Sequence, residues 1–473
     1  MARTSAKKYR PWTPEVNAQL ACTPQQRLPE GDLVFFLLDC VGRLDLTRFY
    51  APYEKETRGA PPFDPAMLVC LLLYSYCVGL FSSRKIALAA ERNLAFLAIV
   101  GDDRPDFRTI SDFRKLHLEA FSDVFLEVLN LAAEMGMLGL GNVSFDGSKI
   151  LGNASRHKAM SYGYMKKEKV RLEAEIEALL QQAQQTDGQE DAALGCRRGD
   201  ELPAELQRRE ERLATISAAM QRLEEQARVE AEAERQRRAE AEAERQRAGK
   251  KRRGKEPGPI SEVPDERAQT NFTGPELKIM PQSNKGWDYA GNAQVGVDGM
   301  CQIIVACFVT AAPNDVQQGE PLAQATRENL SKAGVALPVD EAGEVKKIPA
   351  TLDSGYFSAA AVAGMQQQGF DPHVATKRQK HNQTDPTAAT LTLPEGSTPK
   401  ERMAAKLATP AGKALYARRK AIVEPVFGQI KGARGFRRFS LRGMEKINGE
   451  WRLVCLTHNL LKIWRYNCAP SVN

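Results

Sequence analysis

The chain contains few residues that suit zinc or disulfide cross-links. It has nine cysteines and five histidines in 473 residues, and no two cysteines form a Cys-x-x-Cys pair. These counts argue against a zinc ribbon. The cysteine count is odd and several cysteines lie in apolar stretches, so we expect reduced, buried thiols, as in a cytoplasmic protein, and no disulfide framework.

Long apolar runs are missing as well. The most apolar stretch, 66–81, has 16 residues and includes Tyr74, Ser75 and Tyr76, whereas a membrane-spanning helix needs about 20 apolar residues. The first 11 residues are basic and polar and lead into no apolar segment, so we expect no secretory signal and no membrane partner.

Positive charge is concentrated in one part of the chain. The whole sequence has 66 Lys and Arg against 59 Asp and Glu, a net charge of +7. Residues 400–465 alone hold 16 basic and 4 acidic residues, so their surplus exceeds that of the whole chain. Such a local surplus suits a nucleic-acid backbone. The alternative is a solvated basic surface without a partner.

Changes in composition divide the chain into five segments. Pro65 at a first helical position, Ser82 or Ser83 as a cap, and Thr109 or Ser111 as a cap predict three successive helices between Phe63 and Leu116. The expected segments are an N-terminal extension (1–60), an all-helical domain (61–140), the first part of an α/β core (141–162), a charged helical insertion (163–258) and the remainder of the core with basic C-terminal helices (259–473).

The insertion is predicted to be a helical hairpin. Leu172, Ile176 and Leu179 form one narrow apolar seam, and five apolar residues between 206 and 223 form a second. A turn-rich stretch, 186–203, separates them, and AEAERQR occurs twice, at 231–237 and 241–247. The insertion has three candidate roles, namely DNA contact, pairing of two protomers, or spacing.

Short β-rich runs surround two acidic residues. The sequence predicts a strand over 142–146 that ends at Asp146, a hairpin around Asp298-Gly299, and a strand from Ile348 that ends at Asp353. A third acid, Glu424, lies in a predicted helix. Two strand-end aspartates and a helical glutamate can converge at one edge of a sheet.

Three converging carboxylates repel one another unless a cation neutralises them. All-oxygen ligands favour Mg²⁺ or Mn²⁺, and two such ions about 4 Å apart activate an attacking hydroxyl and stabilise a leaving oxygen. We therefore consider Asp146, Asp353 and Glu424 as metal ligands and catalytic residues. The alternative for each aspartate is an Asx turn or a helix cap.

Basic residues near these acids are candidates for phosphate contact. Lys431 follows Glu424 by seven residues, which is about two helical turns. The other candidates are Lys149 and Arg156 after the first aspartate, Lys377 and Arg378 after a predicted strand, and Arg434, Arg437 and Arg438 in the basic C-terminal segment.

Six motifs in order resemble bacterial insertion-sequence transposases of the DDE type, in the branch named for insertion sequence 1182. The resemblance covers nearly the whole chain. The motifs are SSRKIALAAERNLAFLAIVGDDRPDFRTISDFRKLH (82–117), FDGSKILGNASRHKAMSYG (145–163), RRGDELPAELQRREERL (197–213), GWDYAGNAQVGVDG (286–299), TLDSGYFS (351–358) and the segment 416–431.

The resemblance implies a fold and a reaction. It implies an RNase H-like mixed-sheet catalytic core, with an N-terminal all-helical domain for DNA binding or dimerisation and the charged insertion after the first core strand. It also implies two Mg²⁺ ions, for which Mn²⁺ substitutes, cleavage at terminal inverted repeats and joining of 3′-hydroxyl ends to target DNA. The partners implied are double-stranded DNA and a second protomer in the synaptic complex, in the bacterial cytoplasm at the nucleoid.

Related transposases carry a Tyr–Arg–Glu–Lys signature in which the Arg and the Lys contact phosphates. Tyr416, Glu424 and Lys431 match it, and Arg419 lies one residue out of the commonest spacing. Two alternative functions are a non-catalytic DNA-binding relative, such as a domesticated repressor, and a metal-dependent nuclease of the same fold. All three acids are present, which favours the enzyme over the repressor.

Overall fold

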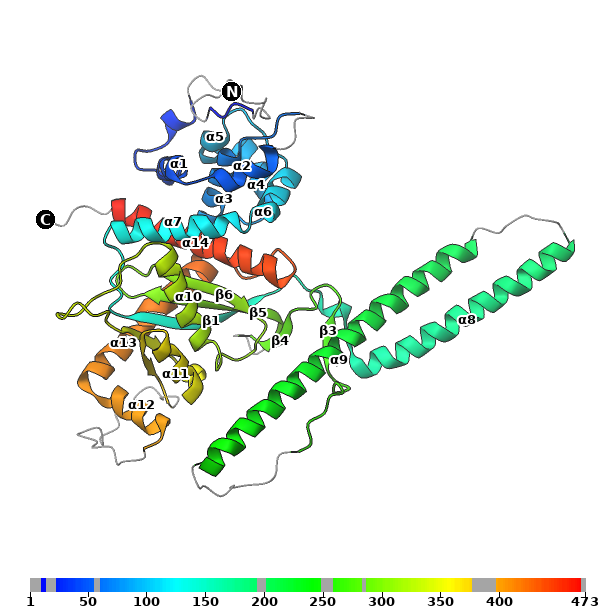
Figure 1. The fold of residues 1–473 in the computed structure, drawn as a ribbon. Helices are drawn as coiled ribbons and strands as arrows, with labels where there is room; N and C mark the ends of the chain where they lie inside the picture. Colours follow the sequence, from blue (N-terminus) through cyan, green and yellow to red (C-terminus); the bar gives the residue numbers. More distant parts are fainter. Residues whose placement is uncertain are drawn as a thin grey trace, which may run out of the picture. The chain divides into compact units, whose positions relative to one another are not determined.

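The protein is described by a computed structural model that covers residues 10–13, 23–54, 60–193, 201–247, 258–282, 286–376 and 397–468. The chain forms two compact units. We call Met1–Asn153 with Ile279–Asn473 the core unit, and Ala154–Lys278 the insertion unit. Figure 1 shows their elements.

The core unit begins with helices that surround a buried helix, α3 (Pro65–Cys77). Pro65 is its first residue, as predicted, and the Asp64 carboxylate accepts a hydrogen bond from Ala66 N at 2.7 Å. Every residue of α3 is buried. The helices around it are α1 (Leu33–Arg43), α2 (Thr47–Glu54), α4 (Ser83–Arg92), α5 (Leu94–Val100), α6 (Phe107–Leu116) and α7 (Ala120–Glu134).

Two helix boundaries differ from the sequence prediction. The Asn93 side chain accepts from Ala95 N and caps α5, so the stretch from Phe63 to Leu116 holds four helices where three were predicted. Asp106 accepts from Thr109 N at 2.7 Å and caps α6 three residues before the nearer predicted cap, Thr109. In both cases a short polar side chain satisfies the backbone N–H groups at a helix start.

A six-stranded sheet forms the centre of the core unit. β1 (Val143–Leu151) lies between antiparallel β5 (Trp287–Asp298) and parallel β7 (Ile348–Leu352). β5 also pairs with β6 (Ile304–Thr310) and β4 (Lys278–Pro281), and β7 pairs in parallel with β8 (Phe370–Val374). The antiparallel β5–β6 pair confirms the predicted hairpin.

β1 is longer than predicted, and Asp146 is not at its end. β1 continues five residues beyond Asp146, because each residue from Gly147 to Leu151 pairs with a residue of β5. Asp146 therefore lies in the middle of a strand. Asp353, in contrast, directly follows β7, as predicted.

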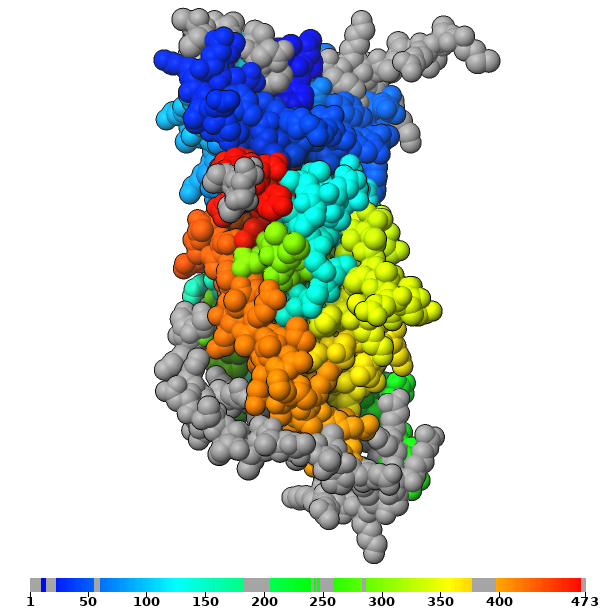
Figure 2. Space-filling view, turned by 90° about the vertical axis from the view of Figure 1, so that its left-hand side faces the viewer, coloured from blue at the N-terminus to red at the C-terminus, as the bar shows by residue number. Residues whose placement is uncertain are grey.

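The remaining helices of the core unit cover this sheet. They are α10 (Gly319–Lys332), α11 (Ala359–Gln367), α12 (Pro399–Ala408), α13 (Pro410–Phe427) and α14 (Met444–Cys468), with a π-helical turn, η4 (Gly428–Ala433), after α13. α13 packs against β1 and β7, and α14 packs against β6, α7 and α3. Figure 2 shows α12 and α13 in orange on one face of the unit and the red end of α14 against cyan α7.

The insertion unit contains the predicted helical hairpin, α8 (Tyr162–Ala193) and α9 (Glu201–Arg247), with a small β2–β3 sheet (Ala159–Ser161 and Gln269–Asn271). The helices extend into the stretch predicted to be a turn, up to Ala193 and from Glu201. Leu172, Ile216 and Leu223 from the two predicted seams are buried together.

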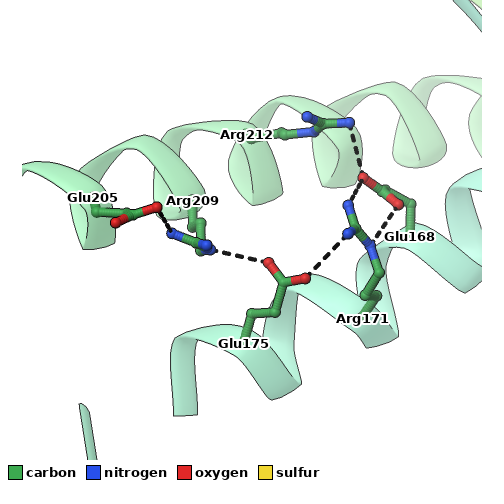
Figure 3. A network of polar contacts seen from close by, with 6 residues as sticks. All are labelled: Glu168, Arg171, Glu175, Glu205, Arg209 and Arg212. Carbon is green, nitrogen blue, oxygen red and sulfur yellow. Dashed lines mark hydrogen bonds and ion pairs between the residues drawn. The ribbon is translucent and has the colours of Figure 1, made fainter. Parts of the chain in front are cut away.

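Ion pairs hold the two helices of this hairpin together (Figure 3). The Glu168 carboxylate is 5% exposed and binds Arg171 at 2.6 Å and Arg212 at 2.8 Å. Arg209 binds Glu205 at 2.8 Å on its own helix and Glu175 at 2.9 Å on the other. Residues 154–278 contain 25 basic and 25 acidic residues, so the surplus of the whole chain comes from the core unit.

Five of the cysteines are buried as free thiols, at 40, 70, 77, 307 and 455, while Cys301 is half-buried and Cys468 is exposed. Cys22 and Cys196 lie outside the described residues. Within the described ranges, no helix is both long enough and apolar enough to cross a membrane.

Candidate active site

The sheet brings the two predicted aspartates together. In the parallel pairing of β1 with β7, Ser144 lies opposite Thr351. Two residues further along the chain from each of these, Asp146 in β1 and Asp353 just after β7 are expected at the same level of the sheet. Asp353 Oδ1 accepts a hydrogen bond from Gly355 N at 2.8 Å, which caps a short 3₁₀ turn and fixes the start of the loop.

The surroundings of Asp146 disfavour its charge. Burial raises the pKa of Asp146 to about 6, the Arg419 guanidinium lowers it, and the neighbouring charges of Asp353 and Asp315 raise it. Arg419 Nη1 lies 3.3 Å from Asp146 Oδ2, and Asp146 Oδ1 accepts from Gly147 N at 2.9 Å. The buried Arg419 therefore only partly compensates for the repulsion between the carboxylates.

Tyr416 lies beside Arg419 on α13. Burial raises the pKa of its hydroxyl, and the charge of Arg419 opposes that shift. Of these two residues of the predicted signature, Arg419 contacts Asp146, and its charge also acts on Tyr416. This position of Arg419 differs from the expectation of a phosphate contact, because its guanidinium is buried against Asp146.

α13 packs against the strand that carries Asp146. Asn142 Nδ2 donates to Leu415 O at 3.3 Å, and Lys431 Nζ donates to Lys149 O at 3.0 Å, so the helical segment and β1 run in the same direction. Ile422, two residues before Glu424, lies against Gly299, whose N–H donates to Asn142 O near the start of β1.

The Glu424 side chain lies on the exposed side of α13. It forms a stripe with exposed Lys413 and Lys420, at helical spacing. Its carboxylate makes no hydrogen bond or ion pair with a residue that the structure describes. Among all the residues that the structure describes, no three Asp, Glu, His or Cys side chains are close enough together to hold a metal ion.

The donor set of the aspartate pair suits a divalent cation. Asp146 and Asp353 offer carboxylate oxygens at the same level of the sheet, and the charge of Asp353 raises the pKa of Asp146. Proteins commonly hold Mg²⁺ with one or two carboxylates, while water and substrate phosphate supply the remaining oxygens. These two residues therefore fit Mg²⁺ or Mn²⁺.

A third aspartate, Asp315, which the sequence analysis did not select, lies near the site. Its Oδ1 accepts from Asn292 Nδ2 and from Gln294 Nε2, both at 2.7 Å, and Lys149 Nζ lies 3.7 Å away. Asn292 and Gln294 alternate along β5, a spacing that places both on one face of the sheet. In the sequence, the signal for this polar site was the pair of amide residues, Asn292 and Gln294, two positions apart in a strand.

Lys431 and Lys149 are held near the site by the protein itself. Lys431 Nζ donates to Ser148 Oγ at 2.9 Å as well as to Lys149 O. Burial lowers the pKa of Lys431, and the Arg437 charge lowers it further. Burial also lowers the pKa of Lys149, against which the Asp315 charge acts.

The other predicted phosphate contacts fall into three groups. Arg437 and Arg438 are exposed and donate to the carbonyls of Lys431 and Gly152. Arg434 differs from the expectation, because its buried guanidinium donates to Thr457 Oγ1 at 2.9 Å and Val454 O at 3.1 Å on α14. Lys377, Arg378 and the side chain of Arg156 lie outside the described part of the chain.

Two segments of the chain match protein-family models. Residues 376–464 match the model described as Transposase DDE domain, and residues 23–116 match Transposase domain (DUF772). The first match includes Glu424, whereas Asp146 and Asp353 lie outside both matches. Each match covers about a fifth of the chain, so the chain is similar to transposases in these two segments. No curated protein and no solved structure matches the chain.

Proposed function

We propose that this protein is a DNA transposase of the insertion sequence 1182 branch, which cleaves DNA at terminal inverted repeats and joins the 3′-hydroxyl ends to target DNA. The register of β1 with β7, which brings Asp146 and the first residue after β7, Asp353, to the same level of the sheet, carries this proposal. The transposase matches at both ends of the chain support it.

Strand order supports an RNase H-like core. Among the long strands in chain order, β1, β5, β6 and β7, the first carries Asp146 and the fourth leads into Asp353. Glu424 follows on α13, a late helix. This is the order that such a core requires, although the insertion separates the first strand from the second.

Asp146 and Asp353 would hold Mg²⁺ or Mn²⁺, and Glu424 is the proposed third acid. When two ions are bound, they activate water or a 3′-hydroxyl and stabilise the leaving oxygen. Exposed basic residues of the chain would orient the DNA at this site. Exposed Lys413 and Lys420 on α13 and exposed Arg437 would bind phosphates, and the buried Arg419 holds Asp146 in place.

The N-terminal helices offer a second surface for DNA. Phe107, at the start of α6, is 37% exposed, and the guanidinium groups of Arg84 and Arg108 lie 5.1 and 5.7 Å from its ring centroid. An exposed aromatic ring flanked by cations binds nucleic acid by stacking and by charge. Two ends must be held together for joining, so a dimer on DNA is part of the proposal.

A cleavage and strand-transfer assay tests this function. The substrates are labelled duplexes that carry the two DNA ends flanking the gene, with Mg²⁺ or Mn²⁺. We expect nicking at the repeat boundary and joining to a plasmid, with loss of both in Asp146→Asn, Asp353→Asn and Glu424→Gln while binding persists. Asp39→Asn, an exposed aspartate on α1, is the control.

The assay separates the alternatives. Binding of the ends without cleavage in either metal would favour a repressor. Nicking of any duplex without joining would favour a nuclease. Normal cleavage by Asp353→Asn would overturn the assignment of the site.

A further inference from the structure

A polar cluster lies against β1 on the side that Gly147, the residue after Asp146, faces. We call Asp315, Asn292, Gln294, Lys149 and Tyr356 the Asp315 cluster. Both amides and the Lys149 ammonium approach the same oxygen, Asp315 Oδ1. The buried Tyr356 hydroxyl donates to Gln294 Oε1 and so fixes the direction of that amide.

The backbone of β1 is built to admit this cluster. A Cβ atom at Gly147 would lie 2.2 Å from Gln294 Nε2, 2.9 Å from Asp315 Oδ1 and 3.0 Å from Asn292 Oδ1. Such distances are too short for any side chain. Glycine directly after Asp146 therefore lets the cluster lie against the strand that carries the first acid.

The second oxygen of Asp315 faces the other acid. The Cβ position of Gly355 lies 3.0 Å from Asp353 Oδ1 and 3.9 Å from Asp315 Oδ2, so the two carboxylates converge on it. Lys149 is 19% exposed at its side chain, and the charges of Asp315, Asp146 and Asp353 all act on its ammonium. Of the three carboxylates, Asp315 exerts the strongest effect on Lys149.

We propose that Asp315 is a positioning residue that retains the Lys149 ammonium and thereby leaves Asp146 and Asp353 open to a divalent cation. This inference rests on the proposed function. Without the charge of Asp315, the Lys149 ammonium would act only on Asp146 and Asp353, and Arg419 already pairs with Asp146. A nearby ammonium offsets the negative charge that attracts a divalent cation.

The net charge of five residues predicts the order in which four proteins bind a divalent cation. The four proteins are the wild type, Asp315→Asn, Lys149→Gln and the double variant. Asp146, Asp353, Asp315, Arg419 and Lys149 together carry one net negative charge. Asp315→Asn keeps the acceptor oxygen but brings this group to zero, and Lys149→Gln brings it to two negative charges. The double variant returns to one negative charge, as in the wild type, while Lys431 stays unchanged in all four.

The experiment is a Mn²⁺ titration of these four full-length proteins, followed by electron paramagnetic resonance of the free ion. We expect Asp315→Asn to weaken binding by about tenfold and Lys149→Gln to strengthen it by a similar factor. The double variant should return to within about threefold of the wild type, since its charge is restored. Circular dichroism establishes that each variant is folded.

A purely structural role for Asp315 gives a different pattern. In that case the double variant binds as weakly as Asp315→Asn, and Lys149→Gln does not bind more tightly. Either result overturns the inference, and the Lys149→Gln result stands even if Asp315→Asn fails to fold. Asp146→Asn separates the proposed metal site from the proposed role of Asp315. If the wild type does not bind Mn²⁺, or if Asp146→Asn binds it equally well, the metal site itself is refuted.

Discussion

The charge of Asp146 is expected to destabilise the folded protein at neutral pH. Its pKa is raised from 3.8 to about 6, first by burial and then by Asp353 and Asp315. The folded state therefore binds this proton more tightly than the unfolded state does. The stability that this provides is fully present below about pH 4 and is lost as the pH rises through about 6.

The substitution Asp146→Asn should remove this loss of stability with rising pH. Asparagine resembles the protonated carboxyl in shape and carries no charge. A shift of about two pKa units corresponds to about 3 kcal/mol, because each unit is about 1.4 kcal/mol. The side chain is 21% exposed, so solvent screens this interaction only partly. We expect the variant to be more stable than the wild type by about 2–3 kcal/mol at pH 7.5, and by close to zero at pH 3.5.

Tryptophan fluorescence in a urea titration measures this difference. All four tryptophans, Trp12, Trp287, Trp451 and Trp464, belong to the core unit, which also holds Asp146. The signal therefore reports unfolding of the unit that matters. Titrations between pH 3.5 and 8 give the dependence for each protein, and Asp112→Asn, on an exposed part of α6, is the matched control.

Two results would refute this reasoning. One is an Asp146→Asn protein that is less stable than the wild type at pH 7.5, which would mean that the Arg419 pair outweighs burial. The other is a difference that does not change between pH 3.5 and 7.5. Added Mn²⁺ should stabilise the wild type and leave Asp146→Asn unchanged, because only the protein that binds the ion gains from it.

The remaining predictions concern other parts of the chain. Gly147→Ala should destabilise the core unit by about 1–3 kcal/mol in the same urea assay, since its Cβ meets Gln294, and added Gln294→Ala should recover part of the loss. A Lys413→Ala/Lys420→Ala variant should lower the slope of log K against log salt for DNA binding by about 2, whereas the exposed control pair Lys346→Ala/Lys347→Ala should not. Phe107→Ala should weaken DNA binding about tenfold or more while thermal unfolding is unchanged, and equal affinity would exclude the α6 surface. Glu168→Gln should melt the helical hairpin at lower temperature than Glu205→Gln does, as followed by circular dichroism at 222 nm, because only Glu168 is buried.

Local signals in the sequence were sufficient for several elements. Pro65 at a helix start predicted α3, the Asp298-Gly299 turn predicted the β5–β6 hairpin, and two apolar seams predicted the α8–α9 hairpin. Each rests on residues that are close together in the chain. Helix boundaries were less certain, because Asn93 and Asp106 act as caps only when the helix that follows has a place to pack.

The acid pair was predicted from sequence, but its surroundings were decided by tertiary structure. Asp146 was expected at a strand end, and pairing with β5 extends the strand beyond it. Arg434 was expected to meet phosphate, and packing against α14 buries it. Nothing in the neighbourhood of either residue in the sequence shows which distant element covers it.

The sequence by itself determined the types of chemistry that are present: two aspartates associated with strands, a helical glutamate and a basic C-terminal segment. The tertiary structure decided which charges meet. Asp315 reaches the site from 169 residues beyond Asp146, and Arg419 from 273 residues beyond. Electrostatic interaction depends on distance and burial in space, and these are properties of the folded chain that residue order does not reveal.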